Sequence, residues 1–142
     1  MDFVSKQINF KAHQKCILIG EIGVNHNRNK NTLFKLIDAG INSGVDIIKF
    51  QRFNSTKEIS TFAEKTNYQK RQSDSDSQLE LARNLELPDD WLIEAYEYCK
   101  KKKVGFLCTA FETESVDFIS NILGCKTIKV PSPDITNIPL LE

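Results

Sequence analysis

The sequence predicts an α/β domain that is built on a parallel β-sheet. Four short apolar segments that suit buried strands, residues 16–21, 45–51, 104–111 and 126–130, are separated by stretches with helical spacing. This alternation predicts parallel strands that are joined by right-handed crossover helices. Polar side chains stand at or near the end of each apolar segment, where parallel α/β folds gather their functional groups.

The composition is typical of one globular domain. The 142 residues carry 19 basic and 19 acidic side chains, so the formal net charge is zero, and 40% of the residues are apolar. A protein that binds nucleic acid or an anionic membrane would carry a basic excess. The longest apolar run is Cys16–Ile19, and the first residues lack the apolar centre of a secretory signal. We therefore expect a cytoplasmic protein.

The first half of the chain reads as strand, helix, strand and long loop. The segment CILIGE at 16–21 leads into the turn-forming GVNHNRNKN. From about Asn31 the apolar residues repeat at helical spacing, and this helix should end near Gly44. The strand at 45–51 is followed by a polar stretch, 52–87, in which LELARNLEL suits short helical turns. Loops of this length in compact domains are usually functional.

The second half continues the same rhythm. Pro88 opens a helix that ends in four lysines, Lys100–Lys103, which complement the helix dipole and which we interpret as a solvated helix end. The third strand, 104–111, precedes a helix that stops at Gly124, and the fourth strand is Lys126–Val130. Residues 138–142 suit the start of a further helix. The cysteines form no C-x-x-C pair, so we expect reduced thiols rather than a metal or redox cluster.

The strand ends carry Glu21, Lys49 with Gln51, Thr109, and Lys129 followed by Ser132. Because side chains alternate along a strand, Lys49 shares a face with Gln51, and Glu21 shares one with Ile19. Two inward lysines beside one glutamate suggest an anionic ligand such as a phosphate or carboxylate. The alternative is structural: Lys49 pairs with Asp46 or with an acid on a helix, and Lys129 lies on the surface. In the same way, Asp134 could simply cap a turn.

Several blocks together resemble the sialic acid synthase family, the nonulosonate synthases. The blocks are EIGVNHN at 21–27, KFQ at 49–51, YQ at 68–69, FLCTAF at 106–111 and KVPSPDITNIPLL at 129–141. They occur in the order and at the spacing of the family across almost the whole chain. A series of matches of this kind is far more specific than any single motif.

The resemblance implies a (β/α)8 barrel of TIM type, followed by a small C-terminal antifreeze-like domain, in a homodimer. It implies a transferase that condenses phosphoenolpyruvate with an N-acetylated amino sugar, with manganese or magnesium as the divalent metal. Residues 1–142 would supply the amino-terminal part of that barrel, with its first four strands. The second half of the barrel, with the histidines that bind the metal, and the C-terminal domain would then be absent from this chain.

The resemblance also assigns roles to residues of this chain. Lys49, Thr109 and Lys129 would hold the phosphate and carboxylate of phosphoenolpyruvate. Glu21 and Asp134 would be the two catalytic acids that line the sugar site. Three further residues would contact substrate: Gln51, Tyr68 and Ser132. We expect Tyr68 and Gln69, in the long loop, to fold back over the strand ends and exclude water.

Two positions depart from the family pattern. The family usually has Gly-Glu where this chain has Pro133-Asp134, and the shorter aspartate retracts the carboxyl by one methylene, roughly 1.5 Å. Ala110 replaces a family proline, which affects mainly the stiffness of the loop.

Two alternatives remain at this point. The first is a non-catalytic remnant of such a barrel, or a split-enzyme subunit that completes a site only with a partner chain. The second is another phosphate-binding barrel lyase or aldolase, which the two lysines would serve equally well.

Overall fold

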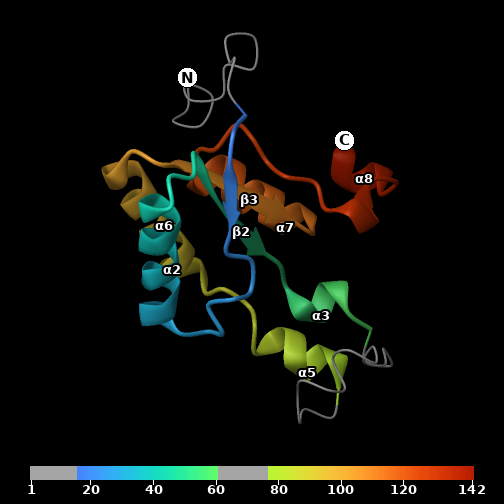
Figure 1. The fold of residues 1–142 in the computed structure, drawn as a ribbon. Coiled ribbons are helices and arrows are strands. Elements are labelled where there is room, and N and C mark those ends of the chain that lie inside the picture. The colour runs from blue at the N-terminus through green and yellow to red at the C-terminus, as the bar shows by residue number, and fades with distance from the viewer. Residues whose placement is uncertain (1–15, 61–76) are drawn as a thin grey trace.

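The computed structural model describes residues 16–60 and 77–142 of the chain. Three parallel strands form one sheet in the order β1 (Ile19–Glu21), β2 (Ile47–Arg52) and β3 (Gly105–Ala110). The chain enters β1 at one end of the sheet, and α3 (Ser55–Glu58) and α5 (Gln78–Arg83) lie at the opposite end (Figure 1). The parallel α/β arrangement predicted from the sequence is therefore confirmed.

The register of the sheet separates two faces. Glu21 pairs with Lys49, and Gln51 pairs with Thr109. Directly paired residues on parallel strands present their side chains to the same face, so these four belong to one face. The other face carries Phe50 and Phe106, whose rings stack at a centroid distance of 4.9 Å.

That second face packs on the helices and forms the main core. The helix α2 (Lys30–Asn42) begins at Asn29, whose side chain accepts a hydrogen bond from the backbone N–H of Thr32, and buries Leu33 and Ile37. The helix α6 (Asp89–Lys102) lies against α2, and the hydroxyl of Tyr98 donates to Asp38 at 2.8 Å. Its first turn carries acids and its last turn lysines, as the helix dipole favours.

The third predicted helix is present but is irregular in its second half. It consists of α7 (Thr113–Asp117) followed by a π-helical turn, η1 (Phe118–Ile122). Gly124, with φ of +69°, ends it at the position predicted. The last element, α8 (Ile138–Leu141), lies within the predicted 138–142 segment.

The fourth predicted strand, 126–130, is not a strand in the structure. Only Lys129 pairs with β3: its backbone N–H donates to Cys108 at 3.0 Å, and its carbonyl accepts from Ala110 at 3.2 Å. Pro131 follows directly and has no N–H with which to extend the ladder. The described residues thus contain three strands of the four that we expected for this part of a barrel.

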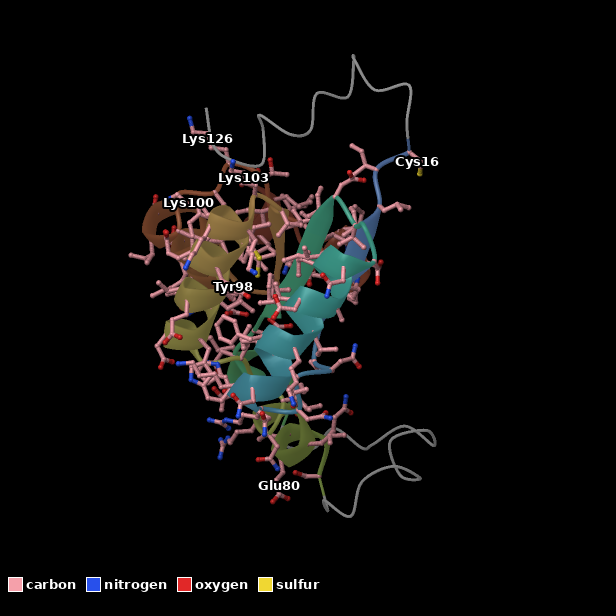
Figure 2. All side chains as sticks on the ribbon, turned by 60° about the vertical axis from the view of Figure 1, so that its left-hand side comes forward. Cys16, Glu80, Tyr98, Lys100, Lys103 and Lys126 are labelled. Carbon is pink, nitrogen blue, oxygen red and sulfur yellow. The ribbon has the colours of Figure 1, made fainter. Side chains whose placement is uncertain are left out.

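The predicted long loop contains two short helices, α3 and α5, in its described parts. Residues 61–76, which include Tyr68 and Gln69, lie outside the described residues. Lys100, Lys103 and Lys126 lie toward the end of the molecule where Cys16 precedes β1, whereas Glu80 of α5 lies at the other end (Figure 2). None of the helices in the described ranges is long and apolar enough to cross a membrane.

Candidate functional site

The candidate site begins with three side chains on one face of the sheet, at the carboxyl ends of the strands. Lys49 Nζ forms a salt bridge with the Glu21 carboxylate and donates a hydrogen bond to Thr109 Oγ1 at 3.3 Å. These three residues come from three different strands. Strand register therefore brings together a cation, a carboxylate and a hydroxyl that are far apart in the sequence.

Burial strengthens the interaction of the Lys49 ammonium with an anion. Its side chain is 16% exposed, whereas that of Glu21 is 40% exposed. A charge that is largely removed from water interacts more strongly with a bound anion, because screening by solvent is weaker. The alternative in which Lys49 pairs with Asp46 is wrong, because the Asp46 carboxylate instead accepts from the backbone N–H of Leu18 at 2.8 Å.

Gln51 joins this group beside Gly23. The backbone of Gly23 has φ of +53°, and a Cβ at this position would lie 2.9 Å from Glu21 Oε1 and 3.6 Å from Gln51 Nε2. A side chain at residue 23 would therefore require the Glu21 carboxylate to shift, whereas its contact with Gln51 would be an ordinary one, and the positive φ also favours glycine.

Lys129 lies on the same face of the sheet as Glu21, Lys49, Gln51 and Thr109 because it pairs with β3. It is the partner of Thr109 in the isolated bridge, so its side chain belongs to the same face as those of Thr109 and Gln51. Its ammonium donates to the carbonyl of Val130. Lys129 therefore lies near the strand ends and is half-buried. The structural alternative required it to lie on the open surface.

A cavity of about 640 Å³ opens at the same end of the sheet. Segments that follow each strand contribute to its lining: Val24 after β1, Phe53 after β2 and Phe111 after β3. Gln51 and Asp134 supply polar groups. Its volume lies in the range of small-molecule sites, and its position after parallel strands is the usual one for such sites.

Of the two predicted site residues that follow Lys129, Asp134 lines the cavity and Ser132 does not. Asp134 lines the cavity, and its Oδ1 also accepts from Asn137 Nδ2 at 3.1 Å. Asp134 therefore does hold a turn, as the structural alternative proposed, while it also faces the cavity. Ser132 begins the short 3-10 turn η2 (Ser132–Asp134) and is exposed, and it does not line the cavity.

His26 is fully buried in the loop after β1. Its Nδ1 accepts from the backbone N–H of Arg28 at 3.0 Å, and burial lowers its pKa from the ordinary value. Within the described part of the chain its Nε2 has no hydrogen-bond partner. This geometry agrees with a structural loop histidine that is neutral at physiological pH.

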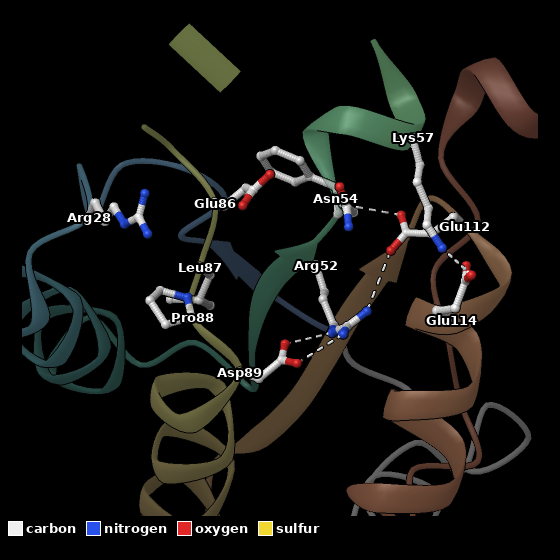
Figure 3. Close-up of a pocket in the computed structure, with 11 residues that line it drawn as sticks. Arg28, Arg52, Asn54, Lys57, Glu86, Leu87, Pro88, Asp89, Glu112 and Glu114 are labelled. Carbon is white, nitrogen blue, oxygen red and sulfur yellow. Dashed lines mark hydrogen bonds and ion pairs between the residues drawn. The ribbon is translucent and has the colours of Figure 1, made fainter. Parts of the chain in front are cut away.

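Sequence reasoning missed two features of this end of the molecule. Arg52 forms a network with Asp89 and Glu112 beside a smaller cavity of about 260 Å³ (Figure 3). Its guanidinium also donates to Ser115 Oγ. Glu58, the last residue of α3, lines the larger cavity. Arg52 ends β2 directly after the segment 45–51, which is a weak signal, and no sequence signal distinguishes Glu58 in its polar stretch.

No set of three histidine, cysteine, aspartate or glutamate side chains comes together as a possible metal site within residues 16–60 and 77–142. The four cysteines all lie in these ranges and form no disulfide.

Comparison with known proteins finds one family and several synthases. The NeuB family profile matches residues 36–142. The N,N'-diacetyllegionaminic acid synthase of Campylobacter jejuni is 43% identical over 130 residues, which are 91% of this chain and 39% of that protein. The enzyme of the same name from Legionella pneumophila is 36% identical over 128 residues, 89% of this chain and 36% of that protein.

Solved structures agree with this likeness. The crystal structure of N-acetylneuraminic acid synthetase from Leptospira borgpetersenii matches with a TM-score of 0.69 and 25% identity, over 89% of this chain and 40% of that chain. The present chain therefore spans about two fifths of the length of the synthases that it resembles.

Proposed function

The chain belongs to the NeuB family, and from that premise we propose that it forms the amino-terminal part of a nonulosonate synthase barrel. The complete enzyme would condense phosphoenolpyruvate with an N-acetylated amino sugar to give a nine-carbon sugar acid. Its relatives carry the names of legionaminic acid and pseudaminic acid synthases, which supports a carbon–carbon bond-forming transferase.

One observation supports this reaction above the others. Lys49 is held between the Glu21 carboxylate and the Thr109 hydroxyl at the carboxyl ends of the strands. Lys129 shares the same face. Phosphoenolpyruvate carries a phosphate and a carboxylate, and two lysines with a hydroxyl donor are suited to bind both. We propose that Gln51, and also Ser132 and Tyr68, complete the contacts with substrate.

The residue types suit the chemistry of the condensation. C3 of phosphoenolpyruvate attacks the aldehyde carbon of the open-chain sugar, and positive charge develops at C2. Water adds at C2, and inorganic phosphate leaves with cleavage of its C–O bond. Lys49 and Lys129 would neutralise the anion as it binds and departs. Glu21 or Asp134 would move protons between the water and the aldehyde oxygen as general acid and base.

A divalent metal remains part of the proposal for the complete enzyme. The described residues do not fit such an ion, because they offer no cluster of three suitable side chains. In line with the family resemblance, we propose that the ligands for manganese or magnesium come from the second half of the barrel, and we derive no step from the metal.

The same proposal covers the remaining organisation of the enzyme. The second half of the barrel, an antifreeze-like domain and a homodimeric partner would complete the site, since this chain spans 39% of its Campylobacter relative. We place the enzyme in the cytoplasm, where thiols stay reduced, and the absence of disulfides among the four cysteines supports this.

The proposal can be tested with a chimaera in which residues 1–142 are joined to the remaining part of the Campylobacter jejuni relative. With phosphoenolpyruvate, an N-acetylated amino sugar and manganese, the chimaera should release phosphate only when both substrates are present. The isolated chain should release none above background. Lys49→Met and Lys129→Met should each lower kcat/KM by about 10²–10³, the usual effect of removing one group that stabilises developing charge.

Lys101→Met is the matched control, because Lys101 is an exposed lysine in the last turn of α6. It should leave phosphate release unchanged. A folded chimaera without activity, robust turnover by the isolated chain, or full activity of Lys49→Met would each contradict the proposed function.

A further inference from the structure

The larger cavity has two kinds of wall. Gln51, Glu58 and Asp134 supply polar groups. Most of the other lining residues are apolar. Leu81 lies in α5, and the others follow β2, α3, α5 and β3: Phe53, Ile59, Leu85 and Phe111. A ligand that fills this space must therefore combine polar groups with apolar substituents.

Among residues 16–60 and 77–142, Glu58 differs from the acids near it, because each of the others has a partner within these ranges. The Glu112 carboxylate accepts from Arg52 Nη1 at 3.4 Å. The Glu114 carboxylate forms a salt bridge with Lys57, and that of Glu86 accepts from the backbone N–H of Ser55 at 2.7 Å.

Within the described ranges the Glu58 carboxyl has no hydrogen bond or salt bridge. Among the described residues, none therefore competes with a ligand for this carboxyl on the cavity wall.

The surroundings of Glu58 also control its protonation. Burial, with the nearby Glu112 and Asp134 carboxylates, raises the pKa of Glu58 to about 7. Near neutral pH the carboxyl is therefore present in both forms, and it can donate a hydrogen bond or accept one. A hydroxyl or an amide N–H of a sugar is a suitable partner for such a group.

We propose that Glu58 is a specificity-determining residue for the acceptor, and that it hydrogen-bonds a hydroxyl or amide N–H of an N-acylated amino sugar whose acyl methyl packs on the apolar wall. This inference rests on the proposed function, because it assigns the acceptor to the cavity beside the phosphoenolpyruvate site. It adds a residue and a chemical preference: the acyl group contributes to binding as well as the hydroxyls.

Nuclear magnetic resonance of the 142-residue chain can test this directly. N-acetylmannosamine is the probe, and mannose is the matched sugar without the acyl group. We expect N-acetylmannosamine to shift the signals of Glu58, Ile59 and Leu81, and mannose to bind more weakly. Glu58→Leu should weaken binding of N-acetylmannosamine about tenfold, as for the loss of one hydrogen bond to a charged group. Glu58→Gln, which retains donor and acceptor atoms, should lose less.

A separate titration with phosphoenolpyruvate distinguishes this inference from the proposed function. It should shift the signals of Lys49 and Thr109 equally in the wild type and in Glu58→Leu. The control Glu97→Gln, on the exposed side of α6, should behave as wild type in both titrations.

Unchanged sugar binding by both Glu58 variants would overturn the inference, as would equal binding of mannose and N-acetylmannosamine. So would sugar shifts confined to other parts of the chain, or no shifts at all. Phosphoenolpyruvate binding with no sugar binding would overturn the inference alone. Sugar binding at Glu58 with no effect of phosphoenolpyruvate on Lys49 would count against the proposed function alone.

Discussion

The guanidinium of Arg52 binds the carboxylate of Asp89 with two parallel hydrogen bonds, Nε to Oδ1 at 2.9 Å and Nη2 to Oδ2 at 3.0 Å (Figure 3). The same guanidinium donates to Ser115 Oγ at 2.8 Å and lies over the ring of Phe118, 4.4 Å from its centroid. Arg52 thus ties the end of β2 to the start of α6 and to the α7 segment. These contacts fix the strand end that carries Gln51.

Loss of Arg52 should destabilise the fold more than loss of Asp89. The Arg52 side chain is 16% exposed and that of Glu112 is 10% exposed, whereas Asp89 is 50% exposed. Arg52→Ala leaves the Glu112 carboxylate without its cation and should lower the free energy of unfolding by about 2–4 kcal/mol. Asp89→Ala should cost about 1 kcal/mol or less. Urea unfolding followed by circular dichroism measures both, and equal losses would contradict this ranking.

The Arg52 network shows the limit of reasoning from sequence. Alternation along 45–51 predicted that Lys49 and Gln51 share a face, and the pairing of Glu21 with Lys49 and of Gln51 with Thr109 agrees with this. The partners of Arg52 are 37 and 63 positions away in the chain. No local pattern specifies such contacts, because they depend on how α6 and α7 pack against the sheet.

The pH dependence of stability should include a contribution from Glu58. Its pKa in the folded chain is about 7, above that of an unfolded glutamate. The folded state therefore binds a proton more tightly than the unfolded state, so this contribution is fully present below about pH 4.5 and is lost as the pH rises through about 7. Glu58→Gln should remove this decline. Unfolding curves of both proteins between pH 4 and 8 provide the test, and parallel profiles would be the contrary result.

His26 should produce the opposite trend. Burial lowers its pKa in the folded chain, so stability is present above the unfolded value of about 6.5 and is lost as the pH falls toward the folded pKa. His26→Gln, which can still accept from the Arg28 backbone N–H, should lose less stability between pH 7 and pH 5 than the wild type. A steeper loss in the variant would show that His26 is not buried in its neutral form.

Thiol reactivity should separate one cysteine from the other three. Cys16 is exposed, whereas Cys99, Cys108 and Cys125 are buried. Burial raises the pKa of Cys99 to about 12 and that of Cys108 further, so neither forms the reactive thiolate near neutral pH. The native chain should therefore react with iodoacetamide quickly at one thiol, located by mass spectrometry at Cys16. Cys16→Ser should abolish the fast phase, and a fast phase that persists would contradict the packing.

The polar residues of the candidate site were predicted from the sequence, but the shape of the site was not. Lys49, Thr109 and Glu21 stood at the ends of apolar segments, and strand register then determined their contacts. The cavity wall from α3 and α5 lies in a polar stretch without periodicity, so its position could not be derived. The fourth strand was predicted from the apolar character of 126–130. In the structure this segment pairs with β3 at Lys129 alone, because Pro131 has no N–H with which to continue the ladder.

Two glycines with positive φ provide a matched test of the loop after β1. Gly23 and Gly44 have φ of +53° and +79°, so an alanine at either position adds backbone strain of about 1 kcal/mol. Their surroundings differ, because a Cβ at Gly44 meets nothing within 4 Å, whereas one at Gly23 lies 2.9 Å from Glu21 Oε1. Gly44→Ala should therefore lower stability without affecting the site. Gly23→Ala should also displace Glu21 and weaken the effect of phosphoenolpyruvate on the Lys49 signal. If both variants leave that effect unchanged, the close approach of Gly23 to Glu21 has no role in organising the site.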